Sequence, residues 1–278
     1  MGQVVSIDWV REQVDKPDVQ IIDCRFVLGD LVAGQQAYNE SHIPGALYVH
    51  LEEDLSGVIS EHGGRHPLPD AETFANKIGS LGIDENVTVI AYDDQGGAMA
   101  SRFWWLMQFL GHPKTVVMDG GFSKWTESGF PVTAEIPAVT ACQYLPVIQE
   151  EMVKSMAEVK EKMNTSGVML IDSREPNRYR GIEEPIDFKA GHIPGALNFF
   201  WKDSLNETGD WKTVEQQRER FSELEQADEI IVYCGSGVTA CPNVLALKEA
   251  GFTNVRLYSG SWSDWITYPD NPIATLEG

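Results

Sequence analysis

A single cysteine, Cys234, stands between a strand-like apolar run and a run of small residues. That run is Gly235, Ser236, Gly237, Val238 and Thr239, and a helical pattern begins at about Ala240. Glycines allow backbone N–H groups to point into such a loop, and a helix N-terminus adds free amides and partial positive charge. These groups stabilise a thiolate or a bound anion. We therefore expect Cys234 to be a nucleophile and the loop to hold its substrate.

Two other interpretations of this cysteine exist. A lone cysteine at a strand end is often a small buried apolar residue, but the glycine-rich loop favours a nucleophile. Cysteine phosphatases have the same strand–loop–helix topology and place an arginine six residues after the cysteine. Ala240 occupies that position here, so bidentate phosphate recognition is lost and phosphatase activity is disfavoured.

The elements that must position Cys234 occur twice in the chain. The segment His42–Leu47 repeats without change as His192–Leu197, and DGGFSKW from Asp119 is echoed by SGSWSDW from Ser259. The order of the repeated motifs is the same in both halves. We predict a first domain over residues 4–134, a linker over 135–150 and a second, catalytic domain over 151–274.

Short β-rich runs alternate with helical patterns in each half, which predicts an α/β fold. Two domains are expected, each a mainly parallel sheet flanked by helices. The expected strands are Gln20–Ile22, Val87–Tyr92, Thr115–Met118, Val168–Ile171, Ile230–Tyr233 and Val255–Tyr258. Such sheets bind ligands beyond the carboxyl ends of their strands, which is where Cys234 lies. The matching position in the first half is Asp93, so we expect only the second half to carry the chemistry, with Asp93 and Asp94 structural.

Composition limits the partners and the compartment. The 278 residues carry a formal net charge of −21, which argues against nucleic acid or an anionic membrane as a partner. A small anionic substrate must then be held by local positive charge. The N-terminus has no apolar signal core and no apolar run is long enough to span a bilayer, so we expect a cytoplasmic protein. Four cysteines without a CxxC pair give no disulfide framework, and we expect neither a metal site nor a cofactor.

The chain resembles the rhodanese family, specifically its tandem two-domain sulfurtransferases. The residues that carry the resemblance are Asp23–Arg25, Asp172–Arg174, both His-Ile-Pro-Gly-Ala segments, Gly63–Pro69, Arg102–Trp105 and the Cys234–Thr239 loop. The resemblance implies that Cys234 takes sulfur from a donor, forming a persulfide, and passes it to cyanide or another thiol. Such two-step covalent chemistry predicts ping-pong kinetics, with the loop amides stabilising the persulfide. The alternative is a persulfide carrier or redox-sensing module without efficient turnover.

The resemblance leaves two sulfur donors open, thiosulfate and 3-mercaptopyruvate. The loop is similar to that of the mercaptopyruvate enzymes, in which a serine at the position of Ser236 aids activation. Those enzymes hold their substrate with two arginines, and only Arg178 matches. The second position is Asp187, which cannot bind a carboxylate, and Lys189 offers a point charge at best. The missing arginine slightly favours thiosulfate.

Three further expectations concern residues around the loop. In mercaptopyruvate enzymes a histidine and an aspartate of the first half relay protons to the loop serine, and His42 and Asp30 would match. His42 and His192 nevertheless read mainly as fold residues, because both halves contain them. Cys241 is expected two turns into the helix, as a buried residue or a resolving thiol. The tryptophans Trp104, Trp105, Trp125, Trp262 and Trp265 are expected to pack the cores and the interface between the halves.

Overall fold

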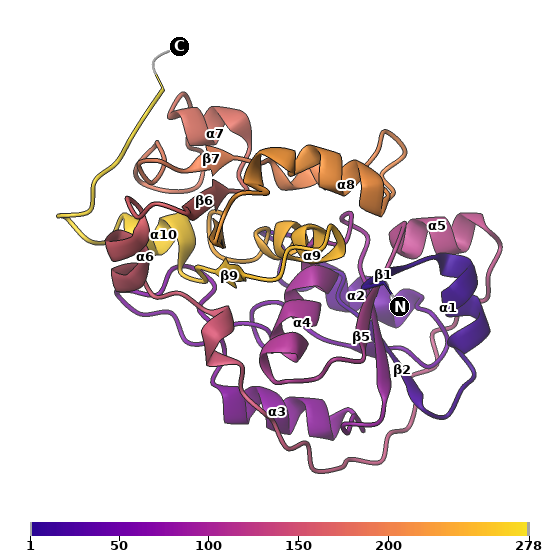
Figure 1. The fold of residues 1–278 in the computed structure, drawn as a ribbon. Coiled ribbons are helices and arrows are strands. Elements are labelled where there is room, and N and C mark those ends of the chain that lie inside the picture. Colours follow the sequence, from indigo (N-terminus) through magenta and orange to yellow (C-terminus); the bar gives the residue numbers. More distant parts are fainter. Residues whose placement is uncertain (1, 277–278) are drawn as a thin grey trace. The chain divides into compact units, whose positions relative to one another are not determined.

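The computed structural model describes residues 2–276 and divides into two compact units (Figure 1). The first unit consists of residues 2–57, 69–149 and 207–211. The second consists of residues 58–68, 150–206 and 212–276. Each unit is built around one parallel sheet, and the two units are described in turn.

The first unit contains a five-stranded sheet in the order β1-β5-β4-β2-β3. All of its strand pairs are parallel, and the long central pair aligns Val19 with Thr88 and Asp23 with Tyr92. Its elements are β1 (Val4–Val5), α1 (Ile7–Gln13), β2 (Val19–Asp23), α2 (Ala33–Glu40), β3 (Leu47–Tyr48), α3 (Ala71–Ser80), β4 (Thr88–Tyr92), α4 (Ala98–Phe109), β5 (Thr115–Met118) and α5 (Gly121–Glu127).

The second unit contains a four-stranded sheet in the order β7-β6-β8-β9, again parallel throughout. Strand β8 leads to Cys234 and pairs with β6 from Val168↔Glu229 to Asp172↔Tyr233. The elements are η1 (Glu150–Met152), α6 (Met156–Lys162), β6 (Val168–Asp172), α7 (Pro176–Arg180), β7 (Leu197–Asn198), η2 (Trp201–Ser204), α8 (Val214–Arg220), η3 (Ser222–Leu224), β8 (Glu229–Tyr233), α9 (Cys241–Glu249), β9 (Val255–Leu257) and α10 (Ser261–Trp265).

The predicted fold class is confirmed, since two parallel α/β sheets are present with helices on their faces. The six expected strands are all present, with ends shifted by at most one residue. These strands are buried on both faces, so their sequences read as nearly continuous apolar runs. The two-residue strands β1, β3 and β7 were not expected, because two residues show no periodicity.

Each sheet has one face covered by its first and last helices. In the first unit α1 and α5 pack through Val10 and Trp125 against Ile21, Ile90 and their neighbours. In the second unit α6 and α10 pack in the same way, through Val159, Trp262 and Trp265 against Leu170, Ile231 and their neighbours. The five tryptophans expected in the cores are all fully buried. The remaining helices include α4 and α9, which pack against β5 and β9.

Local sequence explains where several helices begin. Ser6 and Asp70 accept hydrogen bonds from backbone amides three residues later and so cap α1 and α3. Helix α6 begins with a capping box formed by Ser155 and Glu158. The backbone and hydroxyl hydrogen bonds of Ser155 lower the pKa of Glu158 to about 2.

Two short segments are exchanged between the units: each lies in one half of the sequence but packs with the unit formed mainly by the other half. Residues 58–68, from the first half, pack with the second unit, and residues 207–211, from the second half, pack with the first. The predicted domain boundaries placed both segments in the other unit. Between α5 and η1, residues 134–149 form no helix or strand and lie against the first unit, where Cys142 N donates to Gly79 O and Val147 N to Leu110 O, both over 2.9 Å.

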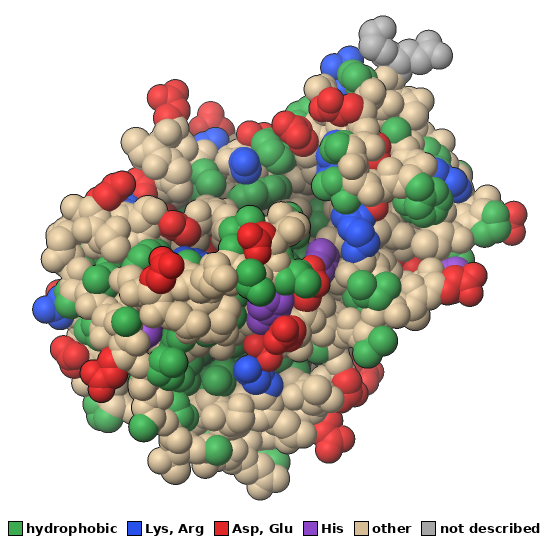
Figure 2. All heavy atoms as spheres, turned by 180° about the vertical axis from the view of Figure 1, so that it is seen from behind, with side chains coloured by type: hydrophobic (Ala, Val, Ile, Leu, Met, Phe, Trp, Pro, Cys, Tyr) green, Lys and Arg blue, Asp and Glu red, His purple; other side chains and the backbone are tan. Residues whose placement is uncertain are grey.

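The surface reflects the acidic composition. Carboxylate side chains are scattered over the face shown in Figure 2 and are not gathered in one patch. Among residues 2–276, no helix is long and apolar enough to cross a membrane.

Candidate active site

Cys234 lies directly after β8, at the carboxyl end of the second sheet, as predicted. The residue is 1% exposed, and its Sγ accepts a hydrogen bond from the backbone amide of Gly237 over 3.2 Å. The loop from Cys234 to Ala240 then leads into α9 (Cys241–Glu249). The sulfur therefore lies in a loop that presents a main-chain donor to it.

The start of α10 fixes the shape of this loop. The amide of Trp262 donates to the carbonyl of Cys234 over 3.0 Å, and the amide of Ser263 donates to the carbonyl of Gly235 over 2.9 Å. Both carbonyls are thereby held against α10. The loop can then present amides to the sulfur while its own carbonyls stay paired.

Two residues of the site have left-handed backbone conformations. Gly237 has φ +81°, and a Cβ there would lie 2.1 Å from the carbonyl oxygen of Ser259, so only glycine fits. Ser261 has φ +57° and is the only non-glycine residue with positive φ among those described. Its hydroxyl accepts from the Cys234 amide over 3.1 Å and donates to the Tyr258 carbonyl over 2.9 Å. Strain of this kind is typical of functional sites.

Two arginines converge beside the loop. A Cβ built on Gly235 would lie 3.1 Å from Nη2 of Arg65 and 3.5 Å from Nη2 of Arg178. Arg178, expected from the sequence, is therefore next to the residue that follows Cys234. Burial lowers the pKa of Arg65. The interaction with Cys234 raises this pKa, and the positive charge of Arg178 lowers it further. Both guanidinium groups stay charged and can hold an anion close to the sulfur.

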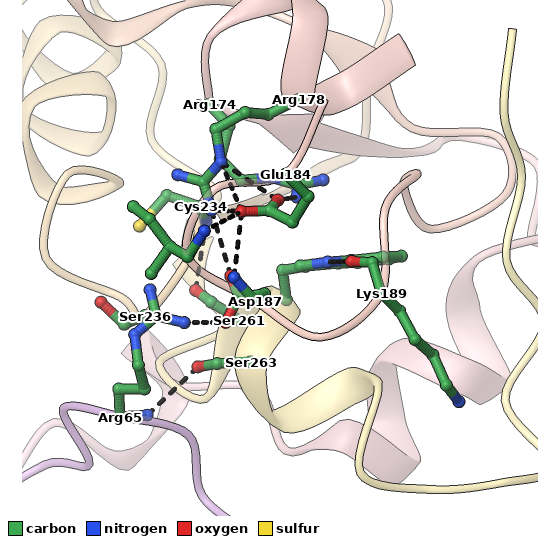
Figure 3. A network of polar contacts seen from close by, with 12 residues as sticks. Arg65, Arg174, Arg178, Glu184, Asp187, Lys189, Cys234, Ser236, Ser261 and Ser263 are labelled. Carbon is green, nitrogen blue, oxygen red and sulfur yellow. Dashed lines mark hydrogen bonds and ion pairs between the residues drawn. The ribbon is translucent and has the colours of Figure 1, made fainter. Parts of the chain in front are cut away.

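Arg65 replaces Lys189 as the second cation of the site. The Nζ of Lys189 points away from the arginines in Figure 3 and lies 3.4 Å from the carbonyl oxygen of Ile266. The interpretation of Lys189 as a substitute for the missing arginine is therefore wrong. Its side chain contacts the carbonyl of Ile266 and does not reach the site of the arginines.

Two acidic residues hold the arginines in place (Figure 3). Glu184 accepts from Arg178 and Arg174 at 2.7 and 3.1 Å, and Asp187 bridges Arg178, at 3.0 Å, and Arg65. The internal ion pair expected for Arg174 is also present, because Arg174 donates to Asp172 over 2.6 Å. Burial alone would lower the pKa of Arg174, but Asp172 outweighs it and raises that pKa.

A histidine contacts the serine of the loop. Nδ1 of His66 lies 2.8 Å from Oγ of Ser236, and both residues are buried. The segment that carries Arg65 and His66 is fastened near α10: the Gly63 amide donates to Asp264 over 2.8 Å, and the Arg65 amide to Ser263 over 3.1 Å. One short helix thus organises both the cysteine loop and these basic side chains.

His42, the other candidate for this proton relay, is engaged elsewhere. Its Nδ1 lies 2.7 Å from the Tyr38 carbonyl and its Nε2 3.1 Å from the Glu135 carbonyl, so it serves the fold of the first unit. Asp30 accepts the amides of Val32 and Ala33, both over 3.2 Å. The fold role expected for His42 fits these contacts, and His66 is the histidine at Ser236.

The last residues of the loop differ in their exposure to solvent. Val238 is buried, and Thr239 is partly exposed at the end of the loop. Cys241 is the first residue of α9 and not two turns into it, which corrects the expectation. The residues between Cys234 and Cys241 form the loop and not helical turns, and α9 begins close to the expected start at about Ala240. Its buried Sγ donates to the carbonyl of Gly237 over 3.3 Å.

The first unit fills the equivalent loop with its own carboxylate. Asp93 is 1% exposed, and its Oδ1 accepts amides from Gln95 and Gly97 at 2.8 and 2.9 Å. Its Oδ2 accepts amides from Met99 and Ala100 at 2.7 and 2.9 Å. Burial raises the pKa of Asp93, and these amides oppose the rise. The anion cradle of this unit is therefore occupied by the chain itself, in line with the structural role expected for Asp93.

The second unit is a parallel α/β fold with a cysteine at the end of a strand, in a loop that donates an amide to its sulfur, and two guanidinium groups lie beside this loop. A family model described as a rhodanese-like domain matches residues 6–128 and 155–268. The chain therefore belongs to the rhodanese family, and it carries that domain twice, as the tandem sulfurtransferases do.

Three known proteins illustrate the similarity. A probable 3-mercaptopyruvate sulfurtransferase of Pseudomonas aeruginosa is 40% identical over 279 residues, covering 99% of this chain and 98% of the relative. A mitochondrial thiosulfate/3-mercaptopyruvate sulfurtransferase 1 of Arabidopsis thaliana is 31% identical over 301 residues, covering 99% and 78%. The solved structure of SseA from Escherichia coli, described as a 3-mercaptopyruvate sulfotransferase, superimposes with a TM-score of 0.80 at 31% identity, covering 95% of this chain and 100% of that one.

Sequence reasoning missed Arg65 and His66 as functional residues. The segment GGRHPLP places two basic residues together in an acidic chain. This local cluster of basic residues could have identified Arg65 and His66 as candidates for binding an anion. Their partners, Asp187 and Ser236, are 122 and 170 positions away, so no local pattern points to them.

Proposed function

We propose that Cys234 is the nucleophile of this sulfurtransferase and that it carries the transferred sulfur as a persulfide. The observation that supports this most directly is the Gly237 amide donating to Sγ of Cys234 over 3.2 Å, with Arg65 and Arg178 beside Gly235. Main-chain donors and fixed cations stabilise negative charge on a sulfur before and after it is sulfurated. The names of the relatives supply the donors, thiosulfate and 3-mercaptopyruvate.

The first half-reaction differs between the two donors. The Cys234 thiolate attacks the outer sulfur of thiosulfate, the S–S bond of the donor breaks, and sulfite leaves with the bonding electron pair. With 3-mercaptopyruvate the C–S bond breaks and the enolate of pyruvate leaves, so a proton must reach the leaving carbon. Ser236, with His66 at 2.8 Å, is placed to move that proton.

The second half-reaction regenerates the cysteine. Cyanide or a thiolate attacks the outer sulfur of the persulfide, the persulfide bond breaks, and the Cys234 thiolate leaves. Products are thiocyanate or a new persulfide. Because the donor product leaves before the acceptor reacts, the kinetics are ping-pong. The acceptor, the persulfide and the cytoplasmic location remain predictions from the sequence.

The test combines both donors with two cysteine variants. Thiocyanate is measured from thiosulfate and cyanide, and pyruvate from 3-mercaptopyruvate and a thiol. We expect Cys234→Ser to lose all turnover, whereas Cys142→Ser, at an exposed cysteine of the first unit, retains the parent rate. After donor alone, mass spectrometry should find one extra sulfur on the peptide that contains Cys234.

Two outcomes would overturn the proposal. Turnover that survives Cys234→Ser removes the nucleophile from the mechanism. A protein that loads one sulfur per chain and releases none to cyanide or small thiols is a carrier, which is the alternative function considered from the sequence.

A further inference from the structure

The Asp187 carboxylate bridges the two guanidinium groups beside the Cys234 loop. Its Oδ2 is 3.0 Å from Nη2 of Arg178, and its Oδ1 contacts Nη1 of Arg65. The two guanidinium groups that flank Gly235 are thus bridged by an acid of the same chain. The Asp187 side chain is only 4% exposed, so little solvent screens these contacts.

We propose that the Asp187 carboxylate competes with anionic sulfur donors for Arg65 and Arg178 and so sets their affinity. This inference rests on the proposed function of the Cys234 site. An anion that binds both arginines must displace Asp187 or share the arginines with it. Each charge-assisted bond that the donor forms then replaces one that already exists, so net affinity is low.

Glu184 has a different role in the same segment. Besides Arg174 and Arg178, it accepts the backbone amides of Ile186 and Asp187 at 3.2 and 3.1 Å. Glu184 therefore folds the segment and holds it on the arginines. The side chain of Asp187 contacts only the two arginines among its recorded partners. A neutral residue in place of Asp187 therefore removes a negative charge from the site, while Glu184 still anchors the segment.

The segment that carries Asp187 has little apolar packing. Residues 182–190 form no helix or strand, and Gly181 and Gly191 flank them with φ of +81° and +117°. Ile182, Ile186 and Phe188 are 53, 56 and 71% exposed, so they give the segment no apolar anchor. Displacement of Asp187 costs ion pairs but little packing.

The test is the isosteric change Asp187→Asn, compared with Glu183→Gln. Glu183 lies in the same segment, is exposed, and contacts only the Asn177 amide among its recorded partners, so its variant matches the charge change away from the arginines. We expect Asp187→Asn to lower KM for thiosulfate about tenfold, as the loss of one competing charge-assisted contact predicts, with kcat changed less than twofold. Glu183→Gln should keep the parent KM.

A binding readout separates this inference from the proposed function. Sulfate and pyruvate are unreactive anions, and bound anions raise the melting temperature according to their affinity. We expect each to stabilise Asp187→Asn more than the parent or Glu183→Gln at the same concentration. Asp187→Glu, which restores the charge, should return toward the parent, and Asp187→Ser is measured in the same way if Asp187→Asn does not fold.

The outcomes are distinct. If neither donor is turned over by any protein but the anions stabilise Asp187→Asn selectively, the proposed function fails and the competition stands. If turnover is normal but KM and anion stabilisation in Asp187→Asn match those of Glu183→Gln, the competition is wrong. A higher KM in Asp187→Asn would show that Asp187 organises the arginines for the donor and would also overturn it.

Discussion

The hydroxyl of Ser261 accepts the hydrogen bond of the Cys234 amide over 3.1 Å, from a residue with φ +57°. The equivalent residue in the first unit, in the repeated motif, is Gly121 with φ +68°. Both residues are left-handed, although the glycines before them differ, with φ +76° at Gly120 and −63° at Gly260. Only the unit with the cysteine has a side chain at this position. The left-handed conformation costs an L-residue about 1 to 2 kcal/mol, which the fully buried serine hydroxyl offsets by pairing the cysteine amide.

This relationship predicts different effects on stability for two substitutions at Ser261. Ser261→Gly relieves the strain and loses the hydroxyl, so the two terms offset and the free energy of unfolding should change by less than about 1 kcal/mol. Ser261→Ala loses the hydroxyl and keeps the strain, so it should be less stable than Ser261→Gly by about 1 kcal/mol. Urea denaturation measures both values.

Activity should separate from stability in these variants. Because both release the Cys234 amide, we expect both to lose turnover by a similar factor of about ten, corresponding to one hydrogen bond. Equal stability of the Gly and Ala variants would contradict the strain argument. Parent-like turnover in both would show that the hydroxyl does not position the cysteine.

The contact between His66 and Ser236 predicts a difference between the donors. Transfer from 3-mercaptopyruvate needs a proton at the leaving carbon, whereas sulfite leaves thiosulfate without one. We therefore expect His66→Asn to lower kcat/KM for 3-mercaptopyruvate by about 10² and that for thiosulfate much less, in keeping with the usual size of general acid–base catalysis. The thiosulfate rate of the same preparation is the control for folding. Equal losses with the two donors would indicate a purely structural role.

Alkylation rates should distinguish Cys234 from the other cysteines. Cys24 and Cys241 are as buried as Cys234, so they are matched in access, while Cys142 is exposed. Burial, together with Asp93 and Asp23, raises the pKa of Cys24, and burial with Asp84 raises that of Cys142. A raised pKa leaves these thiols protonated and unreactive at neutral pH.

Iodoacetamide at pH 7, followed by peptide mass spectrometry, measures the four rates. We expect Cys234 to react first, because the Gly237 amide donates to its Sγ and Arg65 and Arg178 lie beside its loop. The rate at Cys142 should rise steeply as the pH is raised toward its pKa, since deprotonation limits it. Similar rates at Cys234 and Cys24 would contradict the role of the loop amide.

The sequence predicts what is local or repeated. The strands at Ile21, Ile90 and Ile231 are recognisable because burial on both faces gives unbroken apolar runs, and the duplication made the same strand end visible twice. Cys234 could be found because a glycine-rich loop after a strand can turn its backbone N–H groups toward a sulfur or an anion. Arg178 required the family resemblance, since nothing local distinguishes it from a surface arginine.

Contacts between distant segments explain what was missed. His66 reaches Ser236 across 170 positions only because Gly63 and Arg65 bond to the region of α10. The expected place for Cys241 is wrong because residues 235–240, between it and Cys234, form a loop and not helical turns, so α9 begins at Cys241 itself. Sequence periodicity does not fix a helix start to better than a few residues.

The occupied loop of the first unit predicts a large loss of stability in Asp93→Asn. The amide group replaces one carboxylate oxygen by a donor, which then faces two buried backbone N–H groups. Buried donors left unpaired cost about 1 to 3 kcal/mol each, so we expect the free energy of unfolding to fall by about 2 to 6 kcal/mol at pH 7. Asp94→Asn is the matched control, because Asp94 is exposed and bonds only to Ser123 among its recorded partners.

The pH dependence of stability gives a second measure of the same residue. Burial raises the pKa of Asp93 in the folded state, so protonation favours folding and its contribution to stability falls as the pH rises from the ordinary carboxyl value, about 3.9, through the raised one. Asp93→Asn removes this titration, and the parent minus variant difference should therefore change over that interval and be flat above it. A difference that is constant from acid to neutral pH would mean that the four amides hold the pKa of Asp93 at its ordinary value, and that the cradle stabilises a negative charge as well as water does.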